Sequence, residues 1–274
     1  MEDRIRLTIT DGVADVRLNR ADKMNALDPP MFRAIAEADA RLKEDQRVRA
    51  VVLSGEGRSF CAGLDVERMM AAAEGESILQ FADLTKRTHG IANFAQHIVW
   101  IWRELPVPVI AAVHGVALGG GFQLALGADF RYVAPGTRFG IIETKWGLVP
   151  DMAGTQLMRH PAREDVVREL TYTARIFSAE EALEFGFATR LVDDPLAAAL
   201  ETARVIAERS PDSIRAAKRL LNQAVTCDAH VGLAAETDEQ RELLGRANHV
   251  EVVRANLERR TPNFTDSSLH RGKR

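Results

Sequence analysis

Three consecutive glycines, Gly119, Gly120 and Gly121, separate an apolar run from an apolar helical pattern. Glycine adopts backbone conformations that other residues avoid, and it lets another molecule approach the main chain. The first N–H groups of a helix have no partner within the helix, and the helix dipole favours negative charge there. The turn could therefore hold a developing oxyanion. A tight turn that serves packing alone is the alternative, because a glycine cluster by itself is a weak signal.

Two carboxylates and one amide side chain follow this turn in the sequence. Glu143 and Asp151 stand eight residues apart, on either side of a turn that contains Gly147 and Pro150. Two carboxylates in an apolar cleft tend to have different pKa values, so one can act as acid and the other as base. Gln123 cannot titrate but can hydrogen-bond.

Each of these three residues also has a purely structural interpretation. Glu143 could be a surface or salt-bridged carboxylate. Asp151 could be the N-cap of a helix over residues 152–159, since Asp is a favoured cap residue. Gln123 could be a core amide that its neighbours satisfy.

Composition limits the class of protein. The chain has 274 residues, of which 46% are hydrophobic, enough for one large domain or a domain with a helical appendage. The formal net charge of −3 provides no basic surface for nucleic acid or for an anionic membrane. Cys61 and Cys227 match no metal-site spacing. We find neither a signal-peptide pattern nor an apolar run of about 18 residues, so we expect a cytoplasmic protein.

The first half of the sequence alternates strand and helix patterns. Residues 4–10 and 13–19 alternate apolar and polar side chains around Asp11-Gly12, which predicts a hairpin. Short apolar runs at 50–53 and 109–113 predict buried strands. Pro29 and Pro30 precede a helical pattern. One long helix is predicted over residues 75–104, because this segment contains few residues other than Gly90 that disfavour a helix.

The last third of the sequence is almost entirely helical. Residues 178–181 form a capping box, and helices are predicted over 195–209, 212–225, 229–246 and 248–259. This order of elements is unlike the even alternation of a doubly wound sheet. The sequence motifs of dinucleotide-binding proteins, P-loop ATPases, α/β-hydrolases and zincins are missing.

Three segments together resemble the crotonase superfamily, which is the enoyl-CoA hydratase/isomerase family. They are SFCAGLD at 59–65, VHGVALGGGFQLALGAD at 113–129 and FGIIETKWGLVPDMAGTQ at 139–156. NRADKMNAL at 19–27, SPDSIRAAKRLLNQ at 210–223 and RRTPNF at 259–264 extend the resemblance over nearly the whole chain.

The resemblance implies an α/β fold, a spiral of ββα units with a helical C-terminal region used for trimerisation. Residues 1–194 would form the core and residues 195–274 the helical region. We expect a homotrimer or a dimer of trimers that acts on an acyl thioester of coenzyme A, without metal or redox cofactor. The backbone amides of Leu64 and Gly120 would hold the enolate oxygen. Loss of one such donor typically costs about 3–4 kcal/mol, roughly 10²–10³ in rate.

The family pattern also bears on the reaction. Hydratases of the family carry glutamate where this chain has Gln123, whereas their second glutamate corresponds to Glu143. The spacing of Glu143 and Asp151 instead resembles the dienoyl-CoA isomerase branch, so we favour double-bond isomerisation of enoyl- or dienoyl-CoA. The alternatives are 2-enoyl-CoA hydration and, from another class, acyl-CoA binding without turnover. Further substrate contacts are expected from Lys23, Ala26, Ala62, Gly63, Asp65, Gly119 and Trp146.

Overall fold

The computed structural model describes residues 3–76, 79 and 82–267. Within these residues the strands form a six-stranded sheet in the order β1-β2-β3-β4-β6-β9 and a three-stranded sheet in the order β5-β7-β8. The strands of the larger sheet are β1 (Ile5–Thr10), β2 (Val13–Leu18), β3 (Ala50–Gly55), β4 (Val109–Val113), β6 (Phe130–Val133) and β9 (Arg190–Leu191). Those of the smaller sheet are β5 (Val116–Leu118), β7 (Arg138–Gly140) and β8 (Ile176–Ser178).

The predicted hairpin is confirmed, since β1 and β2 pair in antiparallel register from Ile5 opposite Leu18 to Thr10 opposite Val13. Asp11 and Gly12 both have positive φ, at 50° and 79°. A two-residue turn of this kind matches the twist of the strands that it joins. The remaining neighbours in the larger sheet, from β2 to β9, pair in parallel.

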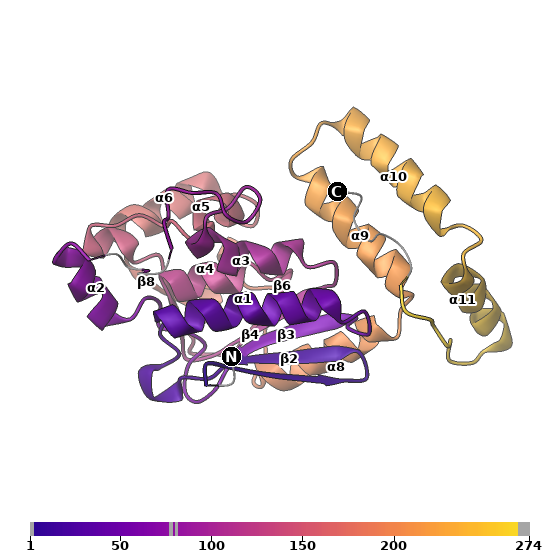
Figure 1. Ribbon diagram of the computed structural model, residues 1–274, viewed down its shortest axis with the longest axis horizontal. Helices are drawn as coiled ribbons and strands as arrows, with labels where there is room; N and C mark the ends of the chain where they lie inside the picture. Colours follow the sequence, from indigo (N-terminus) through magenta and orange to yellow (C-terminus); the bar gives the residue numbers. More distant parts are fainter. Residues whose placement is uncertain (1–2, 77–78, 80–81, 268–274) are drawn as a thin grey trace.

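Helices cover both faces of the larger sheet (Figure 1). On β3, Val51 and Leu53 pack into the core that α1 (Pro29–Glu44) and α3 (Phe94–Glu104) share. The alternate residues Ala50 and Val52 face α8 (Pro195–Ala207) on the opposite side. Burial of both strand faces explains why β3 and β4 are continuous apolar runs in the sequence.

The remaining helices are short, or follow α8 at the C-terminal end of the chain. The short ones are η1 (Ala21–Lys23), α2 (Val66–Ala73), α4 (Gly120–Leu126), η2 (Glu143–Trp146), α5 (Gly154–Met158), α6 (Glu164–Thr173) and α7 (Ala179–Phe185). Those after α8 are α9 (Pro211–Ala224), α10 (Ala229–Leu243) and α11 (Ala247–Glu258), and they extend to one side of the sheet (Figure 1). The four predicted C-terminal helices and the Ser178–Glu181 capping box are confirmed.

The predicted long helix over 75–104 is wrong. Part of that range, residues 77, 78, 80 and 81, lies outside the described residues, and the helix α3 begins only at Phe94. Asn93 and Gln96 form a capping box that starts α3. Gly90 just before it has a φ of +61°, a left-handed conformation that interrupts a helix. The prediction failed because a scarcity of helix-disfavouring residues carries no information about where a cap starts the helix.

Among the described helices, none is both long enough and apolar enough to cross a bilayer.

Candidate active site

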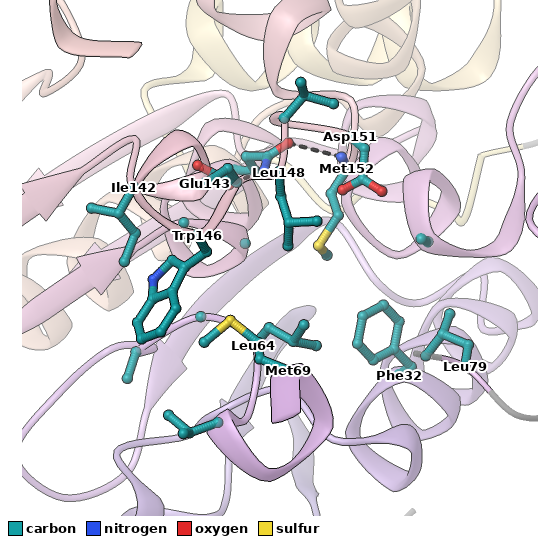
Figure 2. A pocket seen from close by; sticks show the side chains of 18 of the residues that line it. Phe32, Leu64, Met69, Leu79, Ile142, Glu143, Trp146, Leu148, Asp151 and Met152 are labelled. Carbon is teal, nitrogen blue, oxygen red and sulfur yellow. Dashed lines mark hydrogen bonds between the residues drawn. The ribbon is translucent and has the colours of Figure 1, made fainter. Parts of the chain in front are cut away.

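A cavity of about 220 Å³ lies where α1, α2 and α4 approach the segment that begins with η2 (Figure 2). Its walls are Phe32, Ala62, Gly63, Leu64, Val66, Met69, Leu79, Leu84, Ala95, Gly119, Gly120, Gln123, Ile142, Glu143, Trp146, Leu148, Val149, Asp151 and Met152. The glycine-rich turn and both candidate carboxylates, which are far apart in the sequence, therefore meet at one cavity.

The backbone N–H of Leu64 is available to a ligand. Leu27 pairs with the two neighbours of Leu64, because its N–H donates to the Gly63 carbonyl (2.8 Å) and its carbonyl accepts from the Asp65 N–H (3.0 Å). Successive residues in such a bridge direct their N–H groups to opposite sides. Within the described part of the chain, the Leu64 N–H donates to no backbone acceptor.

The second free donor is the N–H of Gly120. Gly120 is the first residue of α4, so its N–H has no partner within the helix. A Cβ placed on Gly63 would lie 3.6 Å from the Gly120 nitrogen, which shows how closely the two segments approach. Two main-chain donors on neighbouring segments thus line the cavity, as an oxyanion site requires.

The glycines of this region are needed for close packing as well as for access of a ligand to the backbone. A Cβ on Gly121 would lie 2.3 Å from the Cys61 carbonyl oxygen, so that residue must be glycine for α4 to approach the strand region. Gly63 has a φ of +91°, a conformation that other residues rarely adopt. The two interpretations of the glycine turn are therefore compatible.

Gln123 links the segments that carry the two carboxylates. Its side chain is 1% exposed, and its Oε1 accepts hydrogen bonds from the backbone N–H groups of Met152 and Gly154, each at 2.9 Å. These two donors fix the orientation of the amide, so that Nε2 donates to Oε1 of Glu143 at 2.5 Å. Gln123 is thus a satisfied core amide, one of the interpretations that its sequence position left open, and it also holds Glu143 in place.

The alternative interpretation of Asp151, as a helix N-cap, is wrong. The helix α5 begins at Gly154 rather than Met152, and its N-cap residue, Ala153, makes no side-chain cap. The Oε1 atom of Gln123 satisfies the amides of this turn instead. Figure 2 shows Asp151 on the same wall of the cavity as Glu143, across from Leu64.

Burial changes the acidity of both carboxylates. It raises the pKa of Glu143, and the nearby negative charge of Asp151 adds to that rise, whereas the Gln123 hydrogen bond partly lowers it. Partial desolvation at the cavity wall also raises the pKa of Asp151, although the residue as a whole remains exposed to solvent. The Oε2 atom of Glu143 is buried and has no hydrogen-bond partner among the described residues. Of the two carboxylate oxygens of Glu143, it is the one that Gln123 does not hold.

The other residues named from the sequence divide into two groups. Ala62, Gly63, Gly119 and Trp146 line the cavity, but Lys23, Ala26 and Asp65 do not.

Those three residues instead make contacts around the start of α2. The exposed ammonium of Lys23 pairs with Glu67 at 3.3 Å. Arg20 bonds both the Asp65 carboxylate (2.5 Å) and the Ala26 carbonyl (3.1 Å). Contact of these three residues with coenzyme A stays a prediction.

Sequence reasoning missed most of the apolar wall. Phe32, Leu79 and Ala95 are buried, yet each is part of the cavity surface. Their sequence positions match those of ordinary core residues, so no local signal distinguishes them. The search for groups of three or more metal-ligating side chains finds none in the described ranges.

Comparison with known proteins agrees with the predicted fold. The model of the enoyl-CoA hydratase/isomerase family matches residues 8–267. A 1,2-epoxyphenylacetyl-CoA isomerase of Escherichia coli K12 is 34% identical over 94% of this chain and 96% of its own. The mitochondrial methylglutaconyl-CoA hydratase of Mus musculus is 30% identical over 96% of this chain and 84% of its own. The crystal structure of an enoyl-CoA hydratase from Bacillus anthracis has a TM-score of 0.84 at 29% identity, covering 96% of this chain and all of that one. The predicted α/β crotonase-like fold is confirmed.

Proposed function

Because the chain belongs to the enoyl-CoA hydratase/isomerase family of enzymes, which act on acyl-CoA thioesters, we propose that it moves a double bond in an enoyl- or dienoyl-CoA. The observation that carries this proposal is the pairing of two carboxylates of raised pKa with two free main-chain donors at one cavity. A base, an acid and an enolate site are the three parts that such a proton transfer needs.

The proposed reaction begins with the thioester carbonyl oxygen on the N–H groups of Leu64 and Gly120. Oε2 of Glu143 removes a proton from carbon, and the electron pair moves to the carbonyl oxygen to give an enolate. Asp151, in its protonated form, returns a proton at a more distant carbon as the electrons flow back. The double bond has then moved and the mass of the substrate is unchanged. Asp151 is exposed, so the two carboxylates can recover their protonation states through solvent.

Hydration is the second candidate, favoured by the names of the hydratase relatives and by Glu143 itself. Oε2 of Glu143 could activate a water molecule that adds to a 2-enoyl-CoA. Gln123 has no titratable group for this step, and its Oε1 already accepts two backbone hydrogen bonds. Only one residue of the Glu143–Gln123 pair can therefore exchange a proton, which is why we place hydration second.

The test is to incubate the protein with 2-enoyl-, 3-enoyl- and 3,5-dienoyl-CoA and to follow absorbance and mass. A change of spectrum at constant mass supports isomerisation. Gain of one water molecule would replace the proposal with hydration. Tight binding without either change would point to a non-catalytic acyl-CoA-binding protein.

We also propose a cytoplasmic homotrimer, or dimer of trimers, that needs no metal or redox cofactor. Large apolar side chains are exposed along the C-terminal helices, including Leu233 at 63% and Leu257 at 81%, which an assembly would cover. Cys61 and Cys227 are both free, as is usual in a reducing compartment. Light scattering would give the mass of the assembly, and turnover after dialysis against a chelator would test the cofactor requirement.

A further inference from the structure

The cavity has an exposed rim and a buried end, and both are apolar. Trp146 and Val149 at the rim are 50% and 67% exposed, whereas Phe32 and Leu79 are each 1% exposed. Figure 2 shows Phe32 and Leu79 on the side of the cavity away from Trp146. A thioester whose carbonyl lies at Leu64 would therefore extend its acyl chain toward the buried end.

No side chain at the buried end of the described wall can pair with an anion at the end of that chain. Among the described residues, the lining contains no lysine, arginine, histidine, serine, threonine or tyrosine. Its polar side chains are Glu143 and Asp151, which are acidic, Gln123, whose oxygen and nitrogen are both already hydrogen-bonded, and Trp146, whose indole N–H belongs to the exposed rim. The free N–H groups of Leu64 and Gly120 would be taken by the thioester.

Two cations near the start of α2, among the described residues, are engaged in ion pairs. Lys23 pairs with Glu67 at 3.3 Å, and Arg68 pairs with Glu76 at 3.0 Å. An anion at the end of the acyl chain would therefore lose water without gaining a partner, and it would lie in the same cavity as two further carboxylates. A hydrocarbon chain would instead gain free energy from burial there.

We propose that the site selects acyl groups that are neutral hydrocarbons beyond the reacting carbons and rejects acyl groups that end in a carboxylate. This inference rests on the proposed function, because it assumes that the thioester occupies the Leu64–Gly120 donors. The site discriminates between acyl groups because a terminal anion has no partner in it. The length and branching of the acyl chain play no part in this discrimination.

Binding of two saturated thioesters tests the proposal without requiring turnover. Octanoyl-CoA and suberyl-CoA have acyl chains of the same length and differ in the terminal carboxylate. We expect calorimetric titration to show at least tenfold weaker binding of suberyl-CoA. Equal affinity would overturn the proposal. Failure of the proposed isomerisation would appear separately, as the absence of any reaction with enoyl- and dienoyl-CoA.

A cation placed in the wall should reverse the selection. Leu84 is partly buried and lines the cavity, so Leu84→Arg should raise the affinity for suberyl-CoA and lower that for octanoyl-CoA. Leu84→Met is the matched control and should leave the wild-type preference in place. A folded Leu84→Arg protein with unchanged affinities would contradict the inference. If that variant does not fold, the wild-type comparison still decides.

Discussion

The Nε2 atom of Gln123 donates a 2.5 Å hydrogen bond to Oε1 of Glu143, while Oε1 of the same glutamine holds the backbone N–H groups of Met152 and Gly154. One buried side chain thus connects the residue proposed as base to the turn that carries Asp151. It occupies one oxygen of Glu143 and leaves the other free. We infer that Gln123 positions both carboxylates without exchanging protons itself.

Replacing Gln123 should change both stability and the pH profile. Gln123→Leu leaves two backbone donors and Oε1 of Glu143 without partners, at about 1–3 kcal/mol for each unsatisfied group. Because the lost hydrogen bond lowers the pKa of Glu143, that pKa should rise further, and the acidic limb of the rate profile should move to higher pH. Chemical denaturation and the pH dependence of kcat would measure the two effects.

The matched variant is Gln123→Glu, which keeps an acceptor for Met152 and Gly154. Its second oxygen would face Glu143, so the two carboxyl groups must share a proton. The acidic limb of the rate profile should therefore again move to higher pH. An unchanged pH profile in both variants would contradict the positioning role.

Glu143→Gln should abolish turnover, with a loss of about 10²–10⁴ in kcat from the missing proton transfer. Affinity for octanoyl-CoA should stay close to the wild-type value, because the backbone donors and apolar walls are untouched. Turnover assays and calorimetry check the two parts. A variant with near-wild-type rate would refute the assignment of Glu143.

The same substitution should not lower stability at neutral pH. The pKa of Glu143 is higher in the folded protein than in the unfolded chain. Its stabilising contribution is therefore fully present only below the unfolded pKa, and it is lost as the pH rises through the folded value. An uncharged glutamine avoids that loss, so thermal unfolding near pH 8 should occur at the wild-type temperature or above it.

Asp151→Asn should lose isomerase activity without losing stability. Asp151 does not cap α5, because Gln123 satisfies the amides of that turn. We therefore expect a change in unfolding free energy within about 0.5 kcal/mol, as for other exposed positions. A loss near 1 kcal/mol with an intact rate would restore the N-cap interpretation.

A proline at residue 120 tests the oxyanion site directly. Gly120 is the first residue of α4, where proline is tolerated because the missing N–H has no helical partner. Gly120→Pro should lower kcat by roughly 10²–10³. The control Gly120→Ala retains the N–H, and its Cβ would meet the flexible end of Met152 at 2.9 Å, so it should retain most of the rate. Equal losses in both variants would indicate crowding and exclude loss of the donor as the cause.

Lys218 attaches α9 to the core. Its ammonium donates to the carbonyls of Trp102 (3.0 Å) and Val107 (2.8 Å) and to Oδ2 of Asp129 (2.8 Å). Lys218→Met leaves these acceptors without their donor, so we expect a loss of about 3–5 kcal/mol in unfolding free energy. Urea denaturation measures it, with Arg204→Met on the exposed face of α8 as control. Similar stability of the two variants would show that the buried lysine is dispensable.

The sequence by itself determined the features that depend on near neighbours. The Asp11-Gly12 turn, the apolar strands β3 and β4 and the Ser178–Glu181 cap all follow from residues a few positions apart. The glycine turn before α4 belongs to the same class, since a positive φ and a close backbone approach are properties of glycine itself.

Only the tertiary structure decided which side chains meet across longer separations. Gln123 hydrogen-bonds Glu143 twenty positions away, and it accepts hydrogen bonds from the turn where a cap by Asp151 was the alternative. Phe32 and Leu79 form the buried end of the cavity, although no local sequence signal distinguishes them from ordinary core residues. The physical reason is that a hydrogen bond or a cavity wall depends on which groups lie within a few ångströms, and sequence spacing specifies this only within a single helix or strand.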